Sequence, residues 1–307
     1  MSSQPASASH RPTDAPHYPR IGLVGRFQDP NIGNDLNDVR AHLEARGREV
    51  WIERDTGARL HIAPQRLMAL SALGAHCDLI IVIGGDGTLL AVARDLAGIT
   101  VDLLGINRGH LGFLVDMPPT DLNAELDRIL AGQGTVRPRF LLAVQLHRQD
   151  ALIAAGVALN DAVVHRAASP RMIEIHSRID GSLVNRHRAD GLVVATPTGS
   201  TAYALSTGGP LIYPSLEAIA LVPICPHTLS NRPIIVDANS HLEIEVHDDQ
   251  GATAQLSLDG QVQYELCMGD RLTITRHPTP LNLLHPPQYD YFHVLREKLH
   301  WASVPAA

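Results

Sequence analysis

An apolar run that ends in glycines constrains this chain more than any other segment. Residues 78–90 read DLIIVIGGDGTLL, so the apolar stretch 79–83 leads directly into Gly-Gly-Asp-Gly. Such a run predicts a strand that is buried on both faces of a parallel sheet. Open α/β sheets bind ligands beyond the carboxyl ends of their strands, and Asp86 falls at that point. Two interpretations stay open here: Asp86 caps the following helix, or it serves a ligand in the crevice.

The charge and the basic residues argue against two classes of function. The net charge of -7 is unlike that of a general nucleic-acid binder, which needs a basic face to neutralise phosphates. Lys298 is the only lysine and has no glycine near it, so the sequence contains no G-x-x-x-x-G-K-[ST] phosphate loop. Any phosphate would therefore be bound by backbone amides, arginine and metal, and we expect no nucleic-acid partner.

Cysteine and hydropathy patterns indicate the compartment. Cys77, Cys225 and Cys267 are widely spaced and form no C-x-x-C pair, which favours a reducing environment. No signal peptide or membrane-spanning run is visible, so we expect a cytoplasmic protein without a membrane partner. The 17 histidines show no H-E-x-x-H or similar spacing, and we predict no metal-ligating residues.

Strand and helix patterns alternate in the first part of the chain. Strands are predicted at 21–25, 49–52, 79–83 and 101–106, with helices at 35–47, 64–73, 88–96 and 121–130. This alternation is typical of βαβ units and a mostly parallel sheet. After Gly134 helices become scarce, and strands are predicted at 140–146, 158–164, 173–179, 192–195, 242–246 and 255–264. Such a pattern indicates mainly antiparallel strands.

The predicted fold is an α/β N-terminal domain with a mostly parallel sheet, followed by a β-rich C-terminal domain. Low hydrophobicity and many Pro and Ser residues predict a disordered tail over 1–19. The α/β domain with the Gly-Gly-Asp-Gly loop is expected over 20–135, and the β-rich domain over 136–290. A C-terminal helix and tail occupy 291–307, and we expect this helix to pack back on the first domain.

Polar motifs interrupt the β-rich half. Asn160-Asp161 breaks an apolar strand, and Asp190-Gly191 precedes another. Residues 196–203 read TPTGSTAY, which is too polar for a core and is either a capped helix start or a phosphate or ribose site. Asp259-Gly260 has the sequence of a hairpin turn.

Together these motifs resemble those of the NAD kinases, which phosphorylate the 2′-hydroxyl of the adenosine ribose of NAD. The resemblance covers nearly all of 21–301 and rests on residues 84–88, 105–109, 160–161, 190–191, 196–203 and 226–230. The first motif also occurs in diacylglycerol and sphingosine kinases, whereas the run 196–203 combined with Asn160 is specific. The chain departs from the family at Asp161, where the family often has glutamate, but the shorter side chain keeps the charge.

The resemblance implies an NAD kinase-like two-domain fold and an enzyme that transfers the terminal phosphoryl of ATP to NAD, making NADP. It implies that Asp86 is the general base at the ribose hydroxyl. The cofactor contacts that it implies are Asp86, Gly87, Asn160, Asp161, Arg171, Arg188, Asp190, Thr201, Ala202, Tyr203, Ala204, Leu205, Ser206 and Gln261. It also implies Mg²⁺ or another divalent cation with ATP, and a homodimer or homotetramer.

Three functions stay open on the sequence. The first is an NAD kinase, and the second is a lipid kinase that shares the Gly-Gly-Asp-Gly loop but leaves residues 196–203 unexplained. The third is a catalytically silent NAD(P)-binding sensor, against which the intact Asp86 argues. Formation of NADP from NAD and Mg·ATP separates all three. Whether Asp86 takes the proton or positions metal is also open.

Overall fold

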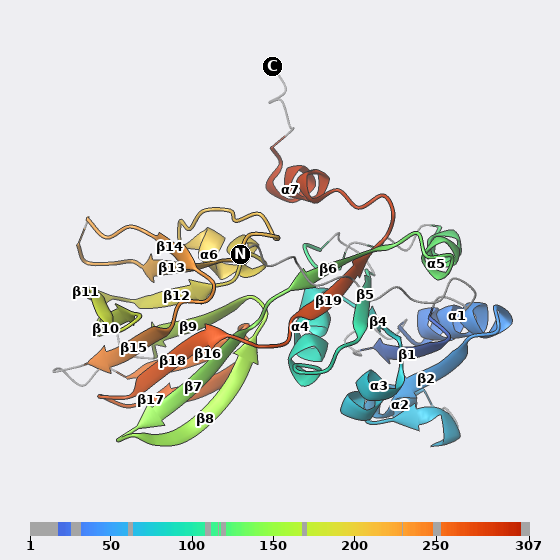
Figure 1. Ribbon diagram of the computed structural model, residues 1–307, viewed down its shortest axis with the longest axis horizontal. Coiled ribbons are helices and arrows are strands. Elements are labelled where there is room, and N and C mark those ends of the chain that lie inside the picture. Colours follow the sequence, from blue (N-terminus) through green and yellow to red (C-terminus); the bar gives the residue numbers. More distant parts are fainter. Residues whose placement is uncertain are drawn as a thin grey trace, which may run out of the picture.

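Two parts of unlike architecture lie side by side: an α/β part built around one sheet, and a part built almost entirely of strands (Figure 1). The computed structural model describes residues 18–25, 32–60, 64–107, 112–115, 117, 121–167, 171–228, 230–247 and 253–301. The predicted fold class is confirmed.

A seven-stranded sheet organises the α/β part. Its strands are β3 (Leu67–Met68), β2 (Glu49–Glu53), β1 (Arg20–Gly25), β4 (Leu79–Ile83), β5 (Asp102–Ile106), β19 (Leu281–His285) and β6 (Thr135–Arg139), in that spatial order. All neighbours run parallel except β19 and β6. Every residue of β4 is buried, which explains why its sequence is apolar throughout instead of alternating.

Helices cover both faces of this sheet. They are α1 (Ile32–Ala45), α2 (Arg54–Arg59), α3 (Leu70–His76), α4 (Asp86–Asp95) and α5 (Leu122–Leu130). Successive residues of a strand point to opposite faces. Accordingly, α1 and α5 share one core with Ile81, whereas α3 and α4 share a separate core with Ile80 and Val82. Gly22 lets α3 approach β1 closely, because a Cβ there would overlap the side chain of Leu73.

Two six-stranded antiparallel sheets form the β-rich part. One has the order β11 (Ser182–Ala189), β10 (Ile173–Ile179), β15 (Leu242–His247), β18 (Arg271–Arg276), β7 (Leu142–Arg148) and β8 (Ala151–Ala158). The other has the order β14 (Ile234–Asp237), β13 (Ala218–Ile224), β12 (Gly191–Ala195), β9 (Asp161–Arg166), β16 (Ala254–Leu258) and β17 (Val262–Leu266). Inward-facing residues of both sheets, such as Ile175 and Val164, make one core.

Several elements differ from the predicted ones. The predicted helix 64–73 is right only in its last part: Pro64–Arg66 forms a 3-10 turn, β3 then pairs with the edge of β2, and the helix α3 begins at Leu70. The predicted strand 158–164 matches β9 only from Asp161 onward, because the chain leaves β8, which the sequence patterns do not indicate, at Ala158 and passes to the other sheet. The predicted strand 255–264 is the β16–β17 hairpin. The sequence patterns do not indicate α2, β11, β13, β14, β18 or β19.

The division into two parts also differs from the predicted boundary at residue 135. Strands β6 and β19 lie almost wholly within the predicted segment 136–290, yet both belong to the first sheet. The chain therefore leaves the α/β part through β6, builds both antiparallel sheets and returns through β19 (Figure 1). Tyr18 falls in the predicted tail, but it is buried and its hydroxyl donates to Asp102 Oδ2 at 2.8 Å. Residues 1–17 of that tail lie outside the described residues.

The last helix, α7 (Tyr291–Leu299), contacts both parts. The rings of Tyr291 and Phe292 pack against Tyr213 of the β-rich part, at centroid distances of 5.4 and 5.7 Å. Lys298 lies over the ring of Phe113, which follows β5 in the α/β part. None of the helices in the described part of the chain has the length and apolar character that crossing a bilayer requires.

Because β19 lies inside the first sheet, shortening one of its buried side chains should destabilise the protein strongly. Leu283 is fully buried in the core beneath α3 and α4, so Leu283→Ala should lower the free energy of unfolding by about 2–5 kcal/mol. Leu152→Ala is the matched control, because that side chain is 57% exposed on β8; its effect should stay below about 0.5 kcal/mol. Urea unfolding followed by circular dichroism measures both, and equally small effects would contradict the position of β19.

Candidate active site

Asp86 is the first residue of α4, but it does not cap the helix. Gly85 occupies the N-cap position, and no side chain makes a capping hydrogen bond there. The carboxylate instead faces the loop after β5. Its Oδ2 accepts from the amide of Phe113 at 2.9 Å. Its Oδ1 accepts from the amides of Leu114 and Val115 at 3.2 and 3.0 Å. The capping interpretation is therefore wrong.

This arrangement fixes the carboxylate and, within the part of the chain that the structure describes, leaves it one acceptor position. A carboxylate offers about four lone-pair sites, and backbone amides fill three of them. Gly112 lies against the carboxylate, and a Cβ at this position would overlap Asp86 Oδ1. Asp86 is half-buried, so the remaining position is open to one ligand, either a hydroxyl proton or a cation.

A hydrogen-bonded clamp joins the start of α4 to the β-rich part. Gln261, which follows the β16–β17 turn, donates from Nε2 to the Gly87 carbonyl at 2.8 Å and accepts from Arg94 Nη2 at 2.7 Å. Arg94 also donates from Nη1 to Asp259 Oδ2 at 3.3 Å. Gly87 and Arg94 are two helical turns apart, so both face the hairpin. The clamp thereby sets the Gly-Gly-Asp-Gly loop against the second sheet of the β-rich part.

The Asp259 carboxylate holds the break between β8 and β9 in place. It accepts from the amides of Leu159, Asn160 and Asp161 at 3.1, 2.8 and 3.2 Å, and its side chain is fully buried. Asp259 and Gly260 both have positive φ, as an Asp-Gly hairpin turn requires. The sequence indicates this turn but not its second role, because the three amides lie 98 to 100 residues away along the chain.

A cavity of about 570 Å³ opens beside this break, a volume typical of small-molecule sites. It is lined by Asn160, Asp161, Val163, His165, Arg166, Ala167, Asp190, Ala202, Tyr203, Ile224, Ser257, Asp259 and Gly260. Five of the predicted cofactor contacts are among these residues: Asn160, Asp161, Asp190, Ala202 and Tyr203. The cavity therefore brings together motifs that lie at the start of β9, just before β12 and in the segment after β12.

The polar groups of the cavity suit a nucleotide. Asn160 Oδ1 is buried without a hydrogen-bond partner in the described part of the chain, although buried polar atoms are normally paired. Asp161 is buried too, and loss of solvation, together with the charge of Asp259, raises its pKa to about 7. Arg166 Nε donates to Asp190 Oδ1 at 2.8 Å. A base edge and ribose hydroxyls form hydrogen bonds as donors and as acceptors. They therefore need acceptors such as Asn160 Oδ1, and a carboxyl group that can both donate and accept.

The 196–203 run is largely buried, contrary to the expectation that it is too polar for a core. Thr196 and Ser200 have no exposed surface, because their hydroxyls donate to backbone carbonyls, each at 2.6 Å. Gly199 passes so close to Asn160 that a Cβ there would overlap its backbone. These hydroxyls therefore support Asn160 from behind and do not form an exposed phosphate site.

The other predicted contacts are not among the residues that line the cavity. Gly87 and Gln261 belong to the clamp, and Arg171 and Arg188 are exposed. Thr201 ends the 3-10 turn Gly199–Thr201, and Ala204, Leu205 and Ser206 belong to the short helix α6 (Tyr203–Ser206). Only 1% of Ala204 is exposed, so it belongs to the core beneath α6.

Sequence reasoning missed several residues of the site. Arg94, His165, Arg166 and Ser257 carry no motif, and their places follow from contacts between distant elements. Arg166 offers the only local signal, because a charged residue there ends the apolar strand β9.

Two family models match the chain, one over each part. The ATP-NAD kinase N-terminal domain matches residues 37–134, and the ATP-NAD kinase C-terminal domain matches residues 159–285. The NAD kinase of Halorhodospira halophila is 47% identical over 295 residues, covering 94% of this chain and 95% of the relative. The NAD kinase of Hahella chejuensis is 43% identical over 286 residues, covering 93% and 97%.

Solved structures of NAD and NADH kinases share the fold. Yeast NADH kinase complexed with NADH has a TM-score of 0.85 at 26% identity, over 95% of this chain and 90% of that one. An NAD kinase from Archaeoglobus fulgidus in complex with ATP has a TM-score of 0.71 at 27% identity, over 92% and 98%.

Fold and site thus define a two-part nucleotide kinase, with a Gly-Gly-Asp-Gly loop on one part and a polar cavity on the other. The chain belongs to the ATP-NAD kinase family. It is an enzyme that phosphorylates NAD to NADP. The alternatives of a lipid kinase and of a catalytically silent sensor find no support.

Loss of Arg94 would leave the buried Asp259 carboxylate without a charge partner. Arg94→Met keeps most of the side-chain length, and we expect it to lower the free energy of unfolding by about 3–5 kcal/mol. Arg296→Met is the matched control, because its pair with Asp290 at 3.5 Å is exposed and should contribute about 0–1 kcal/mol. Urea unfolding measures both variants. If Arg94→Met destabilises no more than the control does, the clamp contributes nothing to stability.

The raised pKa of Asp161 makes stability depend on pH. The unfolded chain ionises this group near its ordinary pKa of about 3.9, so its stabilising contribution is complete below that pH and is lost as the pH rises through the folded value of about 7. The asparagine of Asp161→Asn cannot ionise. The free energy of unfolding of this variant, taken relative to that of the wild type, should therefore rise by about 2–4 kcal/mol between about pH 4 and about pH 8. Asp150→Asn, at a side chain that is 92% exposed, is the control. Urea unfolding at both pH values checks this, and parallel pH curves for Asp161→Asn and the wild type would refute it.

Proposed function

We propose that the enzyme transfers the terminal phosphoryl group of ATP to the 2′-hydroxyl of the adenosine ribose of NAD, with Asp86 as general base. The observation that carries this proposal is the one free acceptor position of a carboxylate that three amides hold in place. A ribose hydroxyl is a weak nucleophile at neutral pH. A positioned carboxylate assists by taking its proton while the oxygen–phosphorus bond forms and ADP leaves.

The cavity beside Asn160 is the proposed site for the adenosine part of NAD. Asn160 and Asp161 would bind the base edge or ribose, Asp190 would accept from ribose hydroxyls, and Ala202 and Tyr203 would line the wall. The remaining proposed contacts are Gly87, Arg171, Arg188, Thr201, Ala204, Leu205, Ser206 and Gln261. The likeness to a kinase that was solved with NADH supports this placement.

ATP and a divalent cation complete the proposed reaction. The archaeal neighbour was solved with ATP. Mg²⁺ usually keeps several waters and is held by one or two carboxylates together with substrate phosphates, where it neutralises developing charge. Asp86, half-buried and with one free position, fits an ion of this kind. Holding the ion is the alternative to the proposed general-base role, because the same position cannot also receive a proton while all three amides stay bound.

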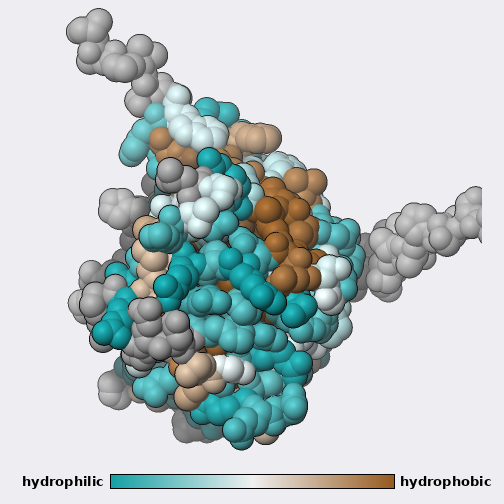
Figure 2. Space-filling model, turned by 90° about the vertical axis from the view of Figure 1, so that its left-hand side faces the viewer, coloured by the Kyte–Doolittle hydropathy of each residue, from teal (hydrophilic) through white to brown (hydrophobic). Residues whose placement is uncertain are grey.

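We also propose that the enzyme works in the cytoplasm as a homodimer or homotetramer. All three cysteines are free thiols, which suits a reducing compartment. The end of the β-rich part has a mainly hydrophilic surface that is interrupted by apolar patches, and such a patch is a candidate contact for a second copy (Figure 2). Light scattering coupled to gel filtration tests the assembly, and a monomer at micromolar concentration would refute it.

Asp86→Asn tests the catalytic assignment. The change removes charge and basicity, so kcat should fall by at least about a hundredfold, within the usual range of general base catalysis. NAD affinity, measured by calorimetry, should change little because the proposed adenosine site lies in the cavity. Asp95→Asn, at the exposed far end of α4, is the matched control and should keep its kcat. NADP formation from NAD and Mg·ATP gives the rates.

Each outcome of this experiment has a separate meaning. Loss of affinity along with rate would make Asp86 a binding residue. An unchanged kcat would remove Asp86 from the reaction. Since the asparagine amide would face the amide of Phe113, donor against donor, thermal unfolding of the variant must accompany the kinetics. A folded Asp86→Ala variant serves the same purpose if the asparagine variant does not fold.

A further inference from the structure

Two Glu-x-His segments face each other on the outer side of one antiparallel sheet. Glu174 and His176 lie on β10, and Glu245 and His247 lie on β15. The register places His176 opposite Glu245 and Glu174 opposite His247. Residues two apart share a face of a strand, so all four side chains lie on the same side, away from the buried Ile175 and its neighbours.

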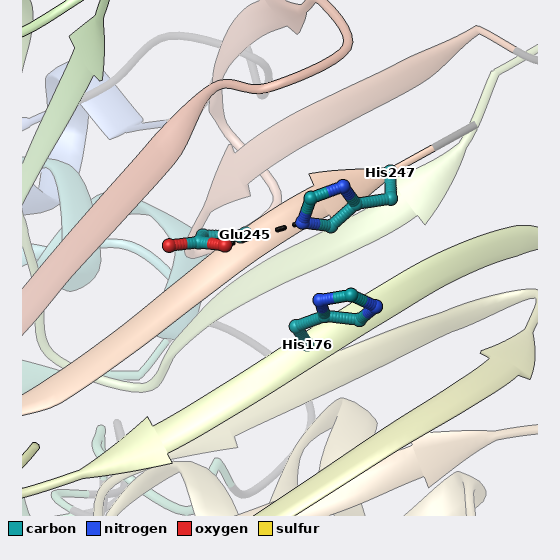
Figure 3. Close-up of side chains that lie close together, drawn as sticks. All are labelled: His176, Glu245 and His247. Atoms are coloured by element: carbon teal, nitrogen blue, oxygen red, sulfur yellow. Dashed lines mark hydrogen bonds and ion pairs between the residues drawn. The ribbon is translucent and has the colours of Figure 1, made fainter. Parts of the chain in front are cut away.

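The side chains lie close enough to share an ion once the two rings, now stacked at an interplanar angle of 28°, turn so that their nitrogens point at one position. One ligand atom from each of His176, Glu245 and His247 lies within 4.8 Å of the others. The two imidazole rings stack at a centroid distance of 3.9 Å, and His247 Nε2 is 3.1 Å from Glu245 Oε2 (Figure 3). Zn–N bonds of about 2.0–2.1 Å separate tetrahedral ligands by about 3.3 Å, so the atoms need to close by about 1.5 Å at most. All three residues are half-buried, which leaves their side chains room for this shift.

Glu174 completes the arrangement from the other side. Its Oε1 is 2.7 Å from His176 Nε2, which leaves Nδ1 of that ring to bind an ion. A metal-ligating histidine almost always donates its other N–H to a carboxylate or carbonyl, which fixes the ring orientation.

We propose that His176, His247 and Glu245 form a binding site for a divalent transition metal of the zinc class, with Glu174 orienting His176. Two imidazoles and one carboxylate suit Zn²⁺, Co²⁺ or Ni²⁺, whereas Mg²⁺ requires oxygen ligands. None of the four residues lines the cavity beside Asn160, although Glu174 pairs across the strands with Arg188, one of the proposed NAD contacts. Sequence spacing does not reveal it, because the ligands meet across two strands.

Calorimetric titration of the full chain with Zn²⁺, in a reducing buffer that contains Mg²⁺, tests the proposal. The wild type should bind one equivalent more than His176→Ala and His247→Ala. Glu174→Gln should keep the stoichiometry and weaken binding by about 10–100-fold, as loss of an orienting partner does. His241→Ala is the matched control: it is an exposed histidine near Glu243 on the same strand edge, and it should bind as the wild type does.

Equal stoichiometry in the wild type and both histidine variants would overturn the proposal, because the ion would then be held by other histidines or by the exposed Cys225 and Cys267. If a variant does not fold, Glu245→Gln replaces it, and the visible absorption of Co²⁺ in the folded wild type reports tetrahedral ligation independently. An absence of these absorption bands at saturating Co²⁺ would also overturn it. The folded histidine variants should keep NAD kinase activity, so failure here is distinguishable from failure of the Asp86 assignment.

Discussion

The buried carboxylate of Asp259 is the interaction on which the geometry of the site depends. A charge removed from water is tolerated only when hydrogen bonds and an opposite charge surround it, and here three amides and Arg94 provide them. The amides belong to the break between β8 and β9, and the guanidinium belongs to α4. One side chain thus sets the distance between the cavity and the Gly-Gly-Asp-Gly loop. Its charge also contributes to the raised pKa of Asp161.

Two aspartate carboxylates in this protein are held by the same pattern of hydrogen bonds but serve different purposes. Asp259 and Asp86 each accept from three consecutive backbone amides. At Asp259 the fourth lone-pair site is filled by Arg94 and the side chain is inaccessible, so the group can only hold structure. At Asp86 no described residue fills the fourth site and the side chain is half-buried, so the group can act on a ligand. The difference between a structural and a reactive carboxylate lies in one acceptor position.

The sequence predicts those features of the fold that depend on residues close together in the chain. The apolar run of β4, the parallel sheet and the Asp-Gly turn are all visible in the sequence, because burial and turn geometry act within a few residues. The second role of Asp259, the pairing of β19 and the roles of Arg94 and Arg166 are not visible, because each depends on partners brought together only by the tertiary fold. The expectation that residues 196–203 are too polar for a core fails for the same reason. Their hydroxyls donate to backbone carbonyls whose positions the sequence does not reveal. The Asn160-Asp161 motif was recognisable because polar residues interrupt an apolar strand.

The insertion of β19 between β5 and β6 has a consequence for biosynthesis. A chain emerges from the ribosome N-terminus first, and domains generally begin to fold in that order. Until Leu281–His285 has emerged, β5 remains an open edge of a parallel sheet, with unpaired amides and carbonyls and an apolar sequence. The first sheet is therefore completed only after both antiparallel sheets have been synthesised. The nascent enzyme carries an aggregation-prone edge for most of its translation, and the two parts finish folding together.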